Sequence, residues 1–324
     1  MRRRILQVAS GGSINPSESK ACDICLYDKT ADSLVIVDGD TWSVEAYPVD
    51  VYTPIGIVVV PGYHNVYGDG SCGVMSLKAM NCDTPSTGGT SEQTMYWGEF
   101  GTDISSLTNY NVVCHIGRYG NPKNTIQGTE NFAYLPSDKF HTVQCPHDTD
   151  AYYYDTMGYY IPSPYLTNGE RNPLYYQTTS PSSLDNAMSD FDGIGNTEKI
   201  ITQRGTKDYN SWTPGRITEA DYPAASCCDM FYTEGTSQGD WYLPACGELG
   251  YIMPPFNKIN DVIDKMRTAY GSSVGVKLNT DGYCWSSTEY YGTSGARSVY
   301  SGNGIVTYDY KYNGLYVRAF LRVK

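Results

Sequence analysis

The chain has 324 residues, enough for about two domains at the usual size of roughly 150 residues each. Charged residues make up only 18% and the formal net charge is -12, which argues against a nucleic-acid partner because a phosphate backbone would be repelled. The 33 glycines and 31 tyrosines, beside only 7 phenylalanines, favour turns and β-structure over a helix bundle.

The first hundred residues are predicted to form a small β module. Short apolar or alternating runs, separated by turn residues, predict strands at 33–37, 41–47, 55–60 and 73–80. We place a boundary near residue 105, with residues 1–105 as an attachment or oligomerisation module and residues 106–324 as a second domain. The longest apolar stretch, 55–60, is too short to span a bilayer, and the polar start of the chain lacks a standard export leader, so we expect no membrane insertion.

The second domain is predicted to be α+β with long irregular insertions. Residues 106–220 are rich in loop-forming residues, as in a fold that tolerates insertions. Two amphipathic helices follow, at 223–232 and 256–271, the second ending at Gly271. Strands are then predicted at 283–287, 297–300, 304–308 and 315–323. Helices followed by consecutive strands indicate an antiparallel sheet rather than an alternating βαβ arrangement.

Cysteine and histidine give weak metal signals. Ten cysteines in a chain of this length are too sparse for a disulfide framework and favour buried thiols. Cys114-His115 and Cys145-Pro-His147, with His141 nearby, offer zinc ligands, but their spacing matches no standard finger. We therefore expect no metal and no cofactor.

Catalytic motifs are absent from the sequence. It contains no G-x-S-x-G, P-loop, H-E-x-x-H or dinucleotide-binding glycine pattern, and carboxylate pairs such as Asp190 and Asp192 are typical of turns. We expect a protein that is not an enzyme. The alternative left open is a glycan-active enzyme that uses acidic residues of the middle region, which would require a deep pocket with two facing carboxylates.

The most informative segment is 290–316, where seven of twenty-seven residues are tyrosine and most of the others are small or polar. This is the composition of an antibody-like binding surface, in which tyrosine supplies contact area and Ser, Gly and Asn supply adaptable hydrogen bonds. A sheet with tyrosine on its solvent face has a similar composition. The tyrosine-rich positions alternate with a regular frame that includes Arg297, Val299, Lys311 and Arg318, which favours the binding surface.

Four ordered motifs carry a family resemblance: residues 239–249 (GDWYLPACGEL), 283–290 (YCWSSTEY), Ala296-Arg297 and 316–321 (YVRAFL). From about residue 145 onward the chain resembles the C-type-lectin-like variable proteins of diversity-generating retroelements from gut Bacteroidales and their phages. Their fold is related to the phage major tropism determinant and to formylglycine-generating-enzyme-like adhesin domains.

The resemblance implies a diversified region at about 290–316 on a fixed scaffold. The ligand-binding positions would be residue types that an asparagine codon reaches by changes at adenine: Tyr291, Ser298, Tyr300, Ser301, Gly302, Ile305, Thr307, Tyr308, Asp309, Tyr310, Tyr312, Gly314 and Leu315. The scaffold would include Trp241, Trp285, Arg297 and Arg318.

The expected function is that of a receptor-binding protein in a phage tail fibre or tail tip, located in the virion. Its partners would be a bacterial surface receptor, protein or glycan, and other tail proteins. A homotrimer would fit a tail fibre, although no heptad pattern argues for one. The alternative is a bacterial surface adhesin of the same fold. The sequence does not identify the receptor.

Overall fold

The computed structural model describes residues 13–108, 152–154, 160–162, 187, 190–204, 221–252, 256–279, 281–290, 293–301 and 306–324. The helices are η1 (Pro16–Glu18), η2 (Gly62–His64), α4 (Gly193–Arg204), α5 (Pro223–Met230), α6 (Cys246–Gly250) and α7 (Phe256–Tyr270). The strands are β1 (Ile24–Asp28), β2 (Ser33–Val37), β3 (Tyr52–Val60), β4 (Cys72–Ser76), β5 (Thr94–Met95), β6 (Tyr152–Tyr154), β7 (Tyr160–Pro162), β8 (Trp241–Tyr242), β9 (Tyr283–Glu289), β10 (Gly295–Tyr300), β11 (Val306–Tyr310), β12 (Leu315–Tyr316) and β13 (Phe320–Val323).

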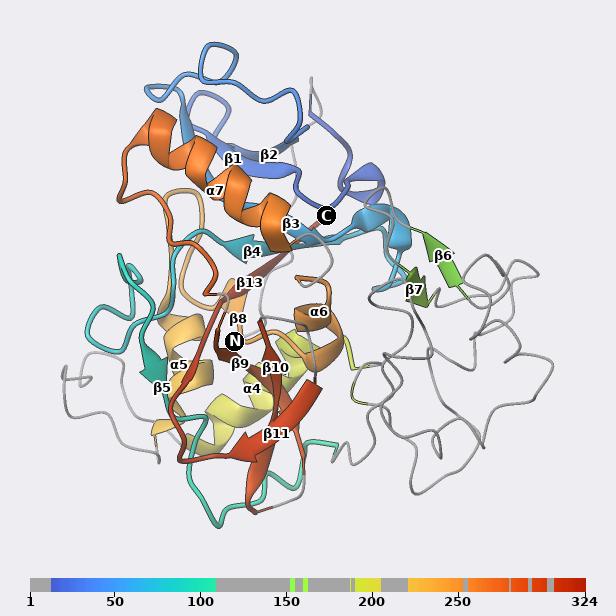
Figure 1. Ribbon diagram of the computed structural model, residues 1–324, viewed down its shortest axis with the longest axis vertical. Coiled ribbons are helices and arrows are strands. Elements are labelled where there is room, and N and C mark those ends of the chain that lie inside the picture. The colour runs from blue at the N-terminus through green and yellow to red at the C-terminus, as the bar shows by residue number, and fades with distance from the viewer. Residues whose placement is uncertain are drawn as a thin grey trace.

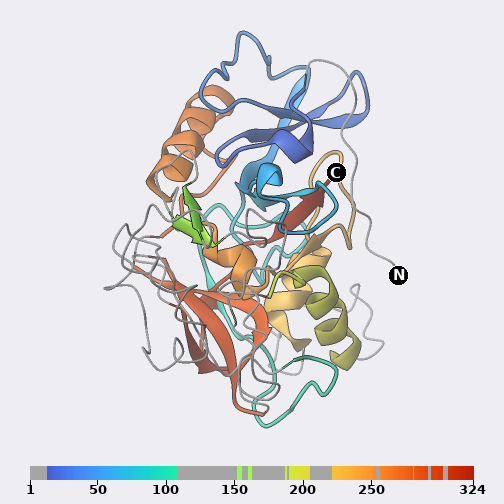
Figure 2. The same ribbon diagram turned by 90° about the vertical axis from the view of Figure 1, so that its right-hand side faces the viewer.

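The described strands form two principal sheets and a small pair (Figure 1). One has six strands in the order β2-β1-β3-β4-β13-β8, and the other has five in the order β11-β10-β9-β12-β5. β6 and β7 pair with each other. The pairings are antiparallel apart from β12 with β9, so the described fold is mixed α+β, as predicted. Figure 2 shows β1 and β2 at one end of the molecule and β10 and β11 at the other.

The six-stranded sheet is covered on both faces, which explains the unbroken apolar runs in its strands. Side chains of a strand alternate between faces, so neighbouring residues enter different cores. Val35 and Val37 join the core under α7, whereas Leu34 and Ile36 join the core on the opposite face. The second core also contains α5 residues and the indole rings of Trp97, Trp241 and Trp285, and it includes residues of both sheets.

Helix α7 confirms the periodicity predicted from the sequence. Its buried residues are Phe256, Ile259, Val262, Ile263 and Met266, with Asn260 beside them. This three-and-four spacing places one apolar stripe against the sheet. The helix ends before Gly271, whose φ of +96° lies in the region that glycine adopts without steric cost.

The single strand predicted at 315–323 is divided between the two sheets. β12 pairs with β5 and β9, whereas β13 lies between β4 and β8. Between them the Arg318 guanidinium is fully buried and bonds to the Leu77 and Lys277 carbonyls. Strands from the first hundred residues therefore share both sheets with the last hundred. The boundary predicted near residue 105 stays a prediction.

The strand predicted at 41–47 is wrong. Asp38 Oδ1 accepts hydrogen bonds from the backbone N–H groups of Asp40 and Thr41, and Trp42 N–H bonds to the Asp38 carbonyl. This local capping by an aspartate favours a turn over a strand. Trp42 then stacks on Tyr270 of α7, with ring centroids 5.9 Å apart. Strand β1 and helix α4 were not predicted.

Candidate binding surface

The outer edge of the five-stranded sheet exposes a row of tyrosines. β11 is its edge strand and pairs with β10, placing Tyr308 opposite Arg297 and Tyr310 opposite Gly295. Tyr308, Tyr310 and Tyr312 are 47%, 46% and 41% exposed. Figure 1 shows β11 at the lower boundary of the molecule, next to β10. Tyr308 and Tyr310 lie on the edge strand and Tyr312 lies in the turn after it, so all three exposed rings are available for contact with another molecule.

These rings form ordered stacks with their neighbours. Tyr310 and Tyr312 are stacked with centroids 5.5 Å apart and 5° between their planes. Phe100, from the first third of the chain, meets Tyr310 edge-on at 6.0 Å and Tyr312 at 5.2 Å. Tyr308 stacks on Tyr290 at 4.1 Å. We call Phe100, Tyr290, Tyr308, Tyr310 and Tyr312 the aromatic face; mutual packing restricts the rotamers of these rings before any partner arrives.

A buried cation extends the Tyr290–Tyr308 stack inward. The Arg297 guanidinium carbon lies 4.3 Å from the centroid of the Tyr290 ring, and Arg297 is only 4% exposed. Burial lowers the pKa of Arg297, but guanidinium stays charged in proteins. The order from interior to surface is therefore Arg297, Tyr290, Tyr308. A cation over the face of a ring stabilises this arrangement.

A buried ion pair holds the turn that carries Tyr310 and Tyr312. Between them Lys311 points inward, where its Nζ lies 2.5 Å from Glu289 Oε1 and 2.7 Å from the Thr102 carbonyl. Both side chains have no solvent exposure. The same ammonium lies 4.8 Å from the Trp97 ring centroid. Lys311 thus fixes the alternation that sends its two tyrosine neighbours outward.

Glu289 is incompletely satisfied in this arrangement. Burial raises its pKa to about 7, against the opposing effect of the Lys311 charge. Its second oxygen, Oε2, is buried without a hydrogen-bond partner. A buried carboxylate in this state depends strongly on its one cation, because the cost of desolvation is otherwise uncompensated. The support of the aromatic face is therefore sensitive to the loss of either charge.

The predicted variable positions separate by exposure. Exposed are Tyr308, Tyr310, Tyr312 and Gly314; half-buried are Tyr300, Thr307 and Asp309; buried are Ser298, Ser301 and Leu315. Tyr291, Gly302 and Ile305 lie outside the described residues. Ser298 lies on β10 opposite Trp285, and Leu315 pairs with Met95 of β5. Ser298 and Leu315 are therefore buried within the sheet, and Ser301 is buried directly after β10.

The predicted scaffold residues lie in the interior. Trp241 and Trp285 are fully buried, and Trp285 Nε1 donates to the Met95 carbonyl at 2.9 Å. Arg318 donates to Glu92 at 2.7 Å in addition to its two carbonyls. Sequence reasoning missed Phe100 and Glu289. No local pattern marks Phe100, since its partners lie more than two hundred residues away.

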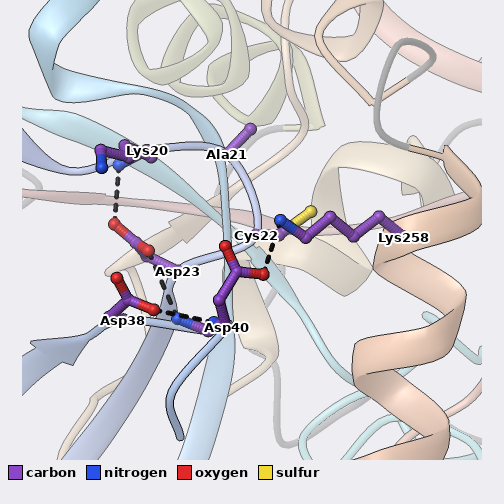
Figure 3. Close-up of a pocket in the computed structure, with 8 residues that line it drawn as sticks. Lys20, Ala21, Cys22, Asp23, Asp38, Asp40 and Lys258 are labelled. Atoms are coloured by element: carbon purple, nitrogen blue, oxygen red, sulfur yellow. Dashed lines mark hydrogen bonds and ion pairs between the residues drawn. The ribbon is translucent and has the colours of Figure 1, made fainter. Parts of the chain in front are cut away.

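A small acidic pocket lies at the other end of the molecule, between β1, β2 and α7. It has a volume of about 110 Å³, and Figure 3 shows Lys258 reaching Asp40 across it, with Nζ 2.8 Å from Oδ1. Asp23 accepts backbone N–H bonds from Lys20 and Gly39, while Asp38 caps its own turn. Burial raises the pKa of Asp23 to about 6. The pocket is well below the roughly 300 Å³ of a typical small-molecule site, and its carboxylates already have partners.

A second group of buried acids lies where α6 begins. Glu248 Oε1 accepts hydrogen bonds from the hydroxyls of Tyr67 and Tyr242, both at 2.8 Å, and Oε2 accepts the Ala245 N–H at 2.7 Å. Burial raises the pKa of Glu248 to about 8, and the nearby Asp190 charge adds to the shift. Asp190 itself accepts from Thr288 and Asn196. These acids are enclosed and fully hydrogen-bonded, as in a structural network.

The described part of the chain has neither a metal-binding cluster nor a helix that could span a membrane. There, no group of three or more His, Cys, Asp or Glu side chains could hold a metal ion. The candidate zinc ligands Cys114, His115, His141, Cys145 and His147 lie outside the described residues. Within the described helices, none combines the length and apolar character needed to cross a bilayer.

The chain is distantly similar to a solved structure. No protein-family model and no curated protein matches the chain. A fimbrial protein from Bacteroides ovatus, known from its crystal structure, is similar with a TM-score of 0.42 and 18% sequence identity. The match covers 93% of this chain and 48% of that one, so the chain spans about half the length of the fimbrial protein. Similarity at this level carries no argument about function.

Proposed function

We propose that this protein is an adhesin-type binding protein that grips another molecule with its aromatic face. The observation that supports this most is the exposure of Tyr308, Tyr310 and Tyr312 in ordered stacks on the edge of the five-stranded sheet. Their arrangement favours binding, because large amphipathic rings supply contact area at a low cost in side-chain freedom.

The support beneath these rings favours tight binding. Association costs free energy for each side chain that becomes ordered, and rings already stacked against Phe100 or Tyr290 lose less freedom. The buried Lys311–Glu289 pair holds the turn in place from below. A partner would therefore meet a surface that needs little rearrangement.

The exposed rings also fit the role of diversified positions in a C-type-lectin-like variable domain. Tyr308, Tyr310 and Tyr312 have little interior packing to lose, so exchange would change the surface and spare the core. Ser298, Ser301 and Leu315 are buried, and we leave them out of the proposed diversified set. The partner would be a bacterial surface receptor, protein or glycan. A bacterial surface adhesin and a phage tail component are two settings for this one function.

The proposal is tested by binding of the labelled full chain to a panel of intact bacterial strains and to an array of purified glycans. We expect the triple variant Tyr308→Ser/Tyr310→Ser/Tyr312→Ser to bind at least about 100-fold more weakly, because central aromatic contacts dominate interfaces. The control is Tyr63→Ser/Tyr232→Ser, which removes rings of 38% and 44% exposure elsewhere on the surface. Equal binding by the triple variant and wild type would refute the proposal.

The two settings are separated by location. Antibodies against the chain, applied to intact cells and to purified phage particles from the same culture, would label cells if it is a surface adhesin and particles if it is a tail component. Labelling of neither, with the chain found only inside cells, contradicts both settings.

A further inference from the structure

Two cysteines that lie far apart in the sequence meet where the chain after β4 contacts helix α5. The Sγ atoms of Cys82 and Cys227 are 3.7 Å apart, and the residues are separated by 145 positions. Eight of the ten cysteines fall within the described residues, and all eight are reduced. A disulfide joins sulfurs about 2.05 Å apart, so these two need to approach by about 1.7 Å.

Hydrogen bonds and core packing around Cys82 hold the two thiols close together. Cys82 packs against the core cluster that contains Cys227. The segment that follows Cys82 is tied to the end of α5, because Tyr232 N–H bonds to the Ser86 carbonyl at 3.0 Å. Asp83 N–H bonds to the Asn81 side chain at 2.7 Å and fixes the turn around Cys82 itself. Anchors on both sides keep the sulfurs within reach of each other.

The two thiols differ in the ways that a stepwise oxidation requires. Cys82 is partly exposed, whereas Cys227 is fully buried. The hydrogen bond between them lowers the pKa of Cys82 and raises that of Cys227. Since the thiolate is the attacking species, Cys82 is the thiol that reacts with an external oxidant, and Cys227 is placed to complete the bond.

We propose that Cys82 and Cys227 form a disulfide when the protein meets a small-molecule disulfide such as oxidised glutathione. The Cys82 thiolate attacks one glutathione sulfur, which forms a mixed disulfide and releases the first glutathione thiolate. The Cys227 sulfur then attacks Cys82 Sγ and releases the second. The protons of the two cysteines pass to the two leaving thiolates, so one oxidised glutathione becomes two reduced molecules while the protein loses two electrons and two protons.

The crosslink would close a long loop of the chain. Residues 83–226 would lie between the joined cysteines, and a bond that closes a loop of this length restricts the unfolded chain strongly. The oxidised protein should therefore be more resistant to heat than the reduced protein. This consequence is independent of whether the aromatic face binds a partner.

The test uses the full chain, purified reduced and equilibrated with oxidised and reduced glutathione at several ratios near pH 8. We expect the number of free thiols titrated in the denatured protein to fall from ten to eight per chain. The melting temperature should rise by at least about 2 °C. After blocking and trypsin digestion, a crosslinked species should join residues 79–118 to residues 217–258. Fragment-ion sequencing must then assign the bond, because the first peptide also carries Cys114 and the second also carries Cys228 and Cys246.

Two variants make the assignment secure. Cys82→Ser should lose the crosslink and the thermal shift, whereas Cys228→Ala, at the neighbouring position of the same helix, should keep both. A glutathione adduct that persists on Cys82, a bond from Cys82 to Cys228, or an unchanged thiol count in the wild-type protein would each overturn the proposal. The peptide result on the wild-type protein decides the question even where a variant fails to fold.

Discussion

Tyrosine has opposite roles in two regions of this molecule. Around Glu248, the hydroxyls of Tyr67 and Tyr242 donate to one carboxylate oxygen in the interior, and burial raises the pKa of both well above the usual range. On the aromatic face, Tyr308 and Tyr310 keep nearly half of their surface in water. The difference shows that the position of a hydrogen-bond acceptor, more than the residue type, decides whether a tyrosine supports the fold or is available to a partner.

The largest expected effect tests how the aromatic face is supported. Glu289→Gln should lower the free energy of unfolding by about 3–5 kcal/mol, because Lys311 is left as a buried charge without its carboxylate. The double variant Glu289→Gln/Lys311→Met removes that charge and should recover part of the loss. Urea unfolding of both variants measures these changes in the free energy of unfolding. If Glu289→Gln is within about 1 kcal/mol of wild type, the ion pair is not what holds the turn.

The buried cluster around Glu248 is tested by measuring the free energy of unfolding at different pH values. The pKa of Glu248 is about 8 in the folded protein and near its ordinary value of 4.5 when unfolded, so between these limits the folded state keeps a proton that the unfolded state releases. Stability should therefore fall as pH rises from about 5 to 8, by up to about 1.4 kcal/mol per pH unit from this group. Urea unfolding at several pH values, followed by tryptophan fluorescence, gives the slope.

Other raised carboxyls contribute to that slope and require a control. The pKa values of Asp23 and Glu289 are also raised, to about 6 and about 7. Comparison with Glu248→Gln isolates the Glu248 share, because the amide does not titrate. If wild type and Glu248→Gln have the same slope between pH 7 and 8, Glu248 is already ionised in the folded protein.

The smallest expected effects compare the two kinds of tyrosine directly. Tyr242→Phe should cost about 1 kcal/mol, because it removes a hydrogen-bond donor from the buried Glu248 carboxyl group. Tyr308→Phe, which keeps the stack on Tyr290, should change stability by less than about 0.5 kcal/mol. Thermal and urea unfolding of the matched pair provide the measurement, and a larger loss for Tyr308→Phe would mean that its hydroxyl serves the fold.

The sequence predicted the elements whose signal is local. The spacing of Phe256, Ile259 and Ile263 indicated α7, and the apolar run at 33–37 indicated β2 with the observed bounds. The strand predicted at 41–47 does not form, because the Asp38 side chain accepts a hydrogen bond from the Thr41 N–H and favours a turn there. The two-sheet arrangement was not predictable, since β12 and β13 look like one strand until their partners are known.

The binding surface was predictable in its composition and not in its geometry. A tyrosine-rich segment indicated a contact surface, yet alternation alone did not show that Ser298 and Leu315 face inward while Tyr308 and Tyr310 face outward. Phe100 joins the surface through contacts across most of the chain, which no local pattern encodes. Such contacts follow from how the sheets are assembled.

The place of β13 inside the six-stranded sheet affects how the molecule is made. β4 is synthesised early, but its partner on one side arrives only with residues 320–323, and the Arg318 side chain that closes the same region binds Leu77 from 241 residues away. Contacts of such high contact order form late, and an unpaired strand edge is a template for association with other chains. During translation the β4 edge therefore stays unpaired until residues 320–323 have been made, and it is open to association with other chains for most of that time.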